Sequence, residues 1–161
     1  MKLRLNRTDV LKEIPAVVAY AIGIACVAAN YGRLPSEVPI HYGLLGVADA
    51  WAPREMVWLF PAIATFLYAS LTLGQYYGKP NLPWTTTRKN RARIYRVTRN
   101  LIWWLKTLLM WMMAYLLYAE VEVAQHHLNG LGHYFAPALA SMPFLTLSAY
   151  FYIAHRIAQQ K

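Results

Sequence analysis

Four long apolar runs constrain this chain more than any other feature. They cover residues 14–32, 56–78, 101–118 and 135–154, and together they carry one charged residue, Lys106. At a rise of 1.5 Å per residue, about 20 helical residues cross a hydrocarbon core of roughly 30 Å. Each run is therefore long enough to span a bilayer, the third being the shortest. The pattern predicts an all-α membrane protein, a four-transmembrane-helix bundle.

Composition supports one membrane domain over residues 1–161. Hydrophobic residues make up 58% of the chain and charged residues only 14%, whereas about a quarter of a typical soluble protein is charged. Pro15 and Pro137 are expected in first helical turns, where the missing N–H costs nothing. Pro61 and Pro143 are expected to kink their helices.

Basic residues indicate the orientation, because Lys and Arg accumulate in cytoplasmic loops. The N-terminal stretch, the connection between the second and third runs and the C-terminal stretch hold 13 of them: Lys2, Arg4, Arg7, Lys12, Lys79, Arg88, Lys89, Arg91, Arg93, Arg96, Arg99, Arg156 and Lys161. The other two connections hold only Arg33 and Arg54. We therefore expect both termini in the cytoplasm and a multi-pass protein of the cytoplasmic (inner) membrane.

Three expectations concern the spans themselves. Lys106 lies close to Trp103 and Trp104, which are expected at the level of the cytoplasmic headgroups. Its ammonium is therefore expected to snorkel to these headgroups. No acidic residue falls within a predicted span, which argues against a proton or cation pathway. Small residues repeat every four positions at Ala21, Ala25 and Ala29, which predicts close helix packing. Ala19 and Gly23 show the same spacing on a neighbouring face.

The connection from Leu34 to Trp51 has the features of an ordered extracytoplasmic loop. Pro35 and Pro39 restrict the backbone and push their predecessors toward extended geometry, while glycines at 43 and 46 permit tight turns. His41 sits between the stiff and the flexible halves. Its side chain is expected either to hydrogen-bond the loop backbone or to contact a ligand.

This loop resembles the hallmark of a membrane-protein family, the domain of unknown function 1648 (DUF1648). The family pattern is Leu-Pro, two residues, a hydrophobic residue, Pro, one residue, His, and then Gly, Asp and Trp at short intervals. It falls on Leu34, Pro35, Val38, Pro39, His41, Gly46, Asp49 and Trp51. An aromatic residue follows the histidine as Tyr42, but Gly43 stands where the family commonly has asparagine. The resemblance extends over residues 14–73.

The resemblance implies recognition rather than catalysis. Similar proteins include the front portion of Sdp-type immunity proteins, which protect bacteria from a secreted peptide toxin. By this analogy His41, Tyr42, Asp49 and Trp51 are candidates for contact with a ligand or partner, such as a secreted peptide. Other members have no assigned activity.

Two further groups of side chains could bind ligands. The second outer connection and its approach hold Glu120, Glu122, His126, His127 and His133, residue types that suit zinc or copper. Their spacing forms no tight ligand motif, so a metal is the weaker expectation. The inner connection holds Arg88, Lys89, Arg91, Arg93, Arg96 and Arg99. Anionic lipid is the expected partner of these cations, and nucleic acid is not expected because interleaved aromatic residues are scarce.

No motif for nucleophilic catalysis or phosphate binding occurs, and Cys26 lies among apolar residues where a thiol stays inert. We therefore expect no enzyme and no cofactor other than lipid. Three functions remain open at this point. The protein binds or scaffolds through its outer loops, as an immunity or receptor-like protein would; it is an accessory subunit of a larger membrane complex; or, as a weaker option, it binds metal.

Overall fold

The computed structural model describes residues 7–77 and 90–159. In these residues four helices are long and apolar enough to cross a membrane, as the apolar runs predict. They are α1 (Arg7–Asn30), α2 (Leu59–Tyr77), α3 (Arg91–Ala124) and α4 (Phe135–Gln159). Short 3-10 turns, η1 (Tyr31–Arg33) and η2 (Arg54–Trp58), lie after α1 and before α2. The chain is thus built as a multi-pass membrane protein.

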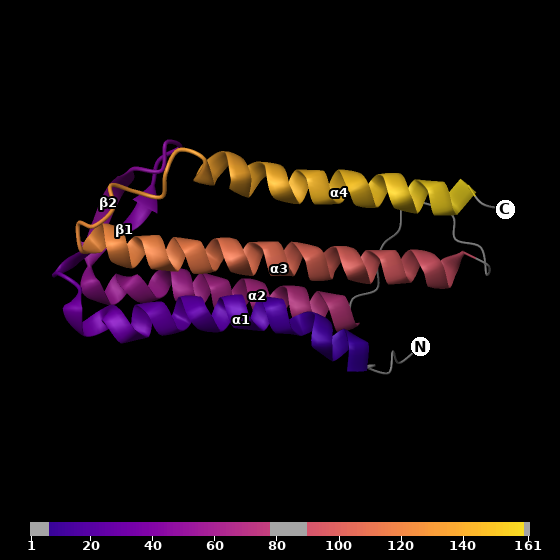
Figure 1. The fold of residues 1–161 in the computed structure, drawn as a ribbon, viewed down its shortest axis with the longest axis horizontal. Helices are drawn as coiled ribbons and strands as arrows, with labels where there is room; N and C mark the ends of the chain where they lie inside the picture. The colour runs from indigo at the N-terminus through magenta and orange to yellow at the C-terminus, as the bar shows by residue number, and fades with distance from the viewer. Residues whose placement is uncertain (1–6, 78–89, 160–161) are drawn as a thin grey trace.

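Helix α3 is the centre of the bundle. It packs against α1, α2 and α4, whereas α4 packs chiefly on α3 alone. In Figure 1, α3 lies between α4 on one side and the α1–α2 pair on the other. The start of α1 and the end of α4 lie at one end of the bundle, with the two strands at the opposite end. We call these the basic end (7–13, 72–77, 91–106 and 150–159) and the hairpin end (31–58 and 119–135).

The helices extend beyond the predicted apolar runs. α3 has 34 residues and is the longest helix, although it contains the shortest of the four apolar runs. Polar residues continue its backbone hydrogen bonding at both ends, which a hydropathy pattern cannot reveal. α1 begins at Arg7, and this early start places Pro15 inside the helix rather than in its first turn. Pro61 instead lies in the first turn of α2, while Pro143 is inside α4 as expected.

The ordered loop contains a β-hairpin, so the fold is not purely helical. Strand β1 (Glu37–Tyr42) pairs antiparallel with β2 (Ala48–Pro53), and the register shifts on either side of His41. Gly46, at φ +77°, lies in the turn region between the strands. Val38 of β1 is fully buried against a cluster from α1 and α3 that includes Val27 and Leu117. This packing fixes the hairpin to the bundle.

The small residues of α1 pack on a different face from the predicted one. Ala21, Ala25 and Ala29 are exposed, whereas the neighbouring stripe with Ala19 and Gly23 is buried. A Cβ atom on Gly23 would lie 2.8 Å from Leu117 Cδ1 and 3.1 Å from the Cα of Ala114, both on α3. The close approach of α1 and α3 therefore depends on this glycine.

Candidate functional site

The hairpin presents one polar and aromatic face outward. In β2 the exposed residues Asp49 and Trp51 alternate with half-buried alanines, as the two-residue period of a strand requires. The Nδ1 atom of His41 lies 2.5 Å from the Asp49 Oδ1 atom, and Trp51 is 41% exposed. His41 thus bonds a side-chain carboxylate and not the loop backbone. Three of the four predicted recognition residues share this face.

Tyr42, the fourth, is directed inward. Its ring packs on the cluster formed by Leu116, Ala119 and Leu131, and its buried hydroxyl has no hydrogen-bond partner among the described residues. Burial raises the pKa of the Tyr42 phenol above its ordinary value, and the nearby carboxylate of Glu120 raises this pKa further. The phenol therefore remains neutral and serves the packing of the hairpin on α3.

The segment between α3 and α4 holds the hairpin turn in place. Leu131 donates its backbone N–H to the Gly46 carbonyl over 2.7 Å, and Val47 forms an isolated bridge with Gly130. Tyr115 of α3 donates its hydroxyl to the Leu131 carbonyl at 2.9 Å. A Cβ atom on Gly46 would lie only 2.6 Å from a backbone oxygen of this segment. The two connections at the hairpin end thus form one structural unit.

Beyond this unit the hairpin tip is apolar and open. Leu44 is 87% exposed and Leu45 is 73% exposed, and Val47 is also exposed. Exposure of such large aliphatic side chains to water is unfavourable. These side chains form an accessible apolar tip, and the exposed residues Asp49 and Trp51 follow it along β2.

The predicted metal ligands do not converge. Glu120 is fully buried in α3, and within residues 7–77 and 90–159 neither of its carboxylate oxygens has a hydrogen-bond partner. Glu122 accepts a hydrogen bond from Nδ1 of His127 at 3.0 Å. α3 ends at Ala124, and His126 adopts a positive φ of 62°, so it does not share a helical face with Glu122. The His133 ring lies beside the Tyr134 ring in a tilted arrangement. Among residues 7–77 and 90–159, no three such side chains come within reach of one metal ion.

Those of the predicted lipid-binding cations that the structure describes lie at the basic end. Arg91, Arg93 and Arg96 are exposed on the first turns of α3. Arg99 is half-buried and its Nη2 atom lies 3.3 Å from the Asp9 Oδ2 atom. Residues 88 and 89, Arg88 and Lys89, fall outside the described part of the chain.

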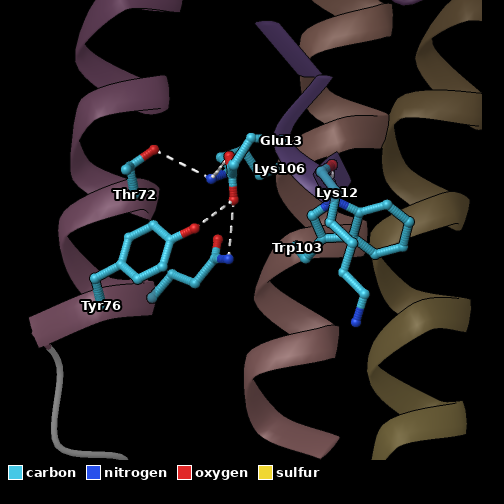
Figure 2. Close-up of polar contacts among 7 residues, drawn as sticks. Lys12, Glu13, Thr72, Tyr76, Trp103 and Lys106 are labelled. Carbon is cyan, nitrogen blue, oxygen red and sulfur yellow. Dashed lines mark hydrogen bonds and ion pairs between the residues drawn. The ribbon is translucent and has the colours of Figure 1, made fainter. Parts of the chain in front are cut away.

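Sequence reasoning missed a buried ion pair at the basic end. The Lys106 side chain is fully buried, and its Nζ atom lies 2.5 Å from the Glu13 Oε2 atom. The other Glu13 oxygen accepts hydrogen bonds from Gln75 and Tyr76, both at 3.0 Å. Thr72 accepts a further hydrogen bond from Lys106 at 3.2 Å. Figure 2 shows these side chains converging from α1, α2 and α3.

This pair corrects two expectations. Lys106 does not snorkel, because Glu13 neutralises its charge in place and Thr72 takes a second N–H. The helices that span also carry acidic residues, Glu13 in α1 and Glu120 in α3. A signal for the pair was present: one cation inside a predicted span requires a counter-ion, and Glu13 directly precedes the first apolar run.

Comparison with known proteins identifies one family. Residues 18–65 match the model described as Domain of unknown function (DUF1648), which confirms the resemblance drawn from the hairpin motif. The matched segment covers most of α1, the hairpin and the first turns of α2, less than a third of the chain's 161 residues. No curated protein and no solved structure matches the chain.

Proposed function

We propose that this protein, with a DUF1648 segment at residues 18–65, is a non-catalytic membrane protein that binds a peptide or protein partner at its hairpin end. The observation that carries the proposal is the outward face of the hairpin. Trp51 and the His41–Asp49 pair are exposed on a strand pair whose opposite face is packed on α3. Binding therefore requires little further ordering of the backbone.

The chemistry of this surface favours a partner with apolar and polar side chains in alternation. Leu44, Leu45 and Trp51 supply apolar area, and aromatic residues are common anchors in interfaces. The exposed His41–Asp49 pair offers a charged hydrogen-bonding group beside them. A secreted peptide, as in the immunity proteins that the family resemblance implies, is the candidate partner for this surface.

An accessory-subunit role is the second candidate, and α4 favours it. Among its residues only Tyr150, Ala154 and Ile157 are buried, while Phe144 and Leu145 are 70% and 65% exposed. A helix that contacts one neighbour and is apolar on its remaining faces suits packing against another membrane subunit. Lipid would cover the same face in an isolated protein.

One cross-linking experiment separates the two candidates. A photo-reactive amino acid replaces Leu44 at the hairpin tip or Phe144 on α4, and the full chain is irradiated in its native cells. Hairpin recognition predicts a discrete protein or peptide adduct at position 44 that is weakened by Asp49→Ala. The accessory role predicts a protein adduct at position 144 whose yield is unchanged by Asp49→Ala. Lipid adducts alone at both positions would contradict both candidates.

A binding assay then tests individual residues. Trp51→Ala and His41→Ala should each abolish or strongly weaken capture of the cross-linked partner. His41 forms an exposed pair with Asp49, so His41→Ala should lower the free energy of unfolding by no more than about 1 kcal/mol. Glu37→Ala is the matched control, since Glu37 is an exposed strand residue at the far end of β1 from the tip. Equal loss of capture in the control would show that the face has no specific contact.

A further inference from the structure

A polar cavity lies at the basic end, on the side of α1 and α3 next to the ion pair. Its volume is about 330 Å³, and its lining includes Asp9, Lys12, Arg96, Arg99, Asn100 and Trp103. These side chains come from α1 and α3, and Gln75 of α2 also reaches the wall. Gln75 connects the cavity to the buried Glu13 carboxylate, to which it donates a hydrogen bond.

The charges that line this cavity do not balance. Lys12, Arg96 and Arg99 contribute three positive charges and Asp9 one negative charge, which leaves a net charge of +2. Asp9 interacts with Arg99, and Lys12 Nζ donates to the Asn100 Oδ1 atom at 3.1 Å. The nearby Glu13 is held by Lys106. The cavity therefore favours an anion that accepts several hydrogen bonds.

The cavity lies where the chain passes from polar to apolar sequence. Residues 91–100 of α3 contain four arginines, and Leu101 and Ile102 begin the apolar run. Trp103 follows, and its indole N–H donates to the backbone carbonyl of Lys12, a contact visible in Figure 2. Indole rings prefer the headgroup level of a bilayer. An anionic headgroup bound here can therefore belong to a lipid whose acyl chains run along the helices.

We propose that this cavity binds the phosphate group of an anionic membrane lipid. Lys12 and the Arg96 guanidinium supply charge-assisted donors to the phosphate oxygens, and Trp103 lines the apolar side. The excess positive charge disfavours a zwitterionic lipid, whose quaternary ammonium group would be repelled. This site differs from diffuse attraction of lipid to surface arginines, because it requires particular residues from α1 and α3. It is independent of the hairpin-end proposal.

The test uses the purified full-length protein in a neutral detergent. Native mass spectrometry measures the binding of phosphatidylglycerol, of phosphatidylcholine with the same acyl chains, and of inorganic phosphate. The variants are Arg96→Gln and Lys12→Gln, with Arg91→Gln as the matched control. Arg91 is an exposed arginine on the same helix that does not line the cavity. Thermal unfolding without lipid verifies that each variant is folded.

We expect saturable binding of phosphatidylglycerol that exceeds binding of phosphatidylcholine. Each cavity variant should weaken it about tenfold or more, the effect of losing one charge-assisted hydrogen bond to the phosphate, while Arg91→Gln changes it no more than about twofold. Equal weakening by Arg91→Gln and Arg96→Gln would overturn the site in favour of diffuse surface charge. Equal affinity for both lipids would overturn the selectivity for an anionic headgroup. If inorganic phosphate displaces the lipid at similar affinity, the cavity binds free phosphate as well as lipid, and the proposal that its ligand is a lipid is overturned.

Discussion

Replacement of Lys106 by methionine should destabilise the bundle more than any surface substitution. The ammonium group is fully buried and lies 2.5 Å from Glu13, and it also lies 5.3 Å from the ring centroid of Tyr68. Lys106→Met keeps much of the side-chain volume but leaves the Glu13 carboxylate, 14% exposed, without a counter-ion. Removing one partner of a buried pair costs about 3–5 kcal/mol. Glu13→Gln leaves the buried ammonium uncompensated and should cost a similar amount.

The double variant decides whether charge compensation is the cause. With Glu13→Gln and Lys106→Met together, neither position carries a charge, and the glutamine can still accept hydrogen bonds from Gln75 and Tyr76. Replacing both members of a buried pair is often nearly neutral, so the double variant should be more stable than either single variant. Strong non-additivity is the expected signature of residues in direct contact.

Unfolding in mixed micelles of a neutral detergent and sodium dodecyl sulfate, followed by circular dichroism, measures these differences. Lys12→Met is the matched control, because Lys12 is an exposed lysine at the same end of the bundle. Its effect should stay within about 0.5 kcal/mol. The reasoning is refuted if Lys106→Met leaves the unfolding midpoint unchanged. It is also refuted if the losses of the two single variants simply add in the double variant.

Four further substitutions test the packing. Gly23→Val should lower the free energy of unfolding by about 1–3 kcal/mol, because the added side chain forces α1 away from α3. Gly74→Ala, which has open space around it, should leave the free energy of unfolding unchanged or raise it by up to about 1 kcal/mol. The same micelle titration measures both. Gly46→Ala should cost about 1–3 kcal/mol locally and should increase amide hydrogen exchange at Leu131 without changing exchange in the centre of α3; unchanged exchange at Leu131 would contradict the backbone contact. Tyr42→Phe removes a buried hydroxyl without a partner and should not reduce stability at neutral pH. Because the folded-state pKa of Tyr42 is raised, the unfolded chain releases the phenol proton above the ordinary pKa of about 10 while the folded protein still holds it. The free energy of unfolding of the wild type should therefore fall as pH rises above about 10, and it should fall more than that of Tyr42→Phe.

The exposed face of the hairpin was partly predictable. The prolines, glycines and motif spacing indicated an ordered loop, and Asp49, Trp51 and His41 do share its exposed face. The inward direction of Tyr42 was not predictable, because the register shifts beside His41 change which face each residue of β1 occupies. Such a shift depends on how the strand docks on α3 rather than on local propensity.

The sequence by itself determined the number of spans and the place of the ordered loop. A bilayer requires about 20 apolar residues per crossing and leaves few ways to satisfy backbone hydrogen bonds, so four runs could be counted without a structure. Only the tertiary structure decided which faces meet and which charges pair. Membrane helices are apolar on nearly every side, so no hydrophobic face distinguishes the stripe of Gly23 from that of Ala25. The partner of Lys106 lies 93 positions away at Glu13, a separation that no local pattern records.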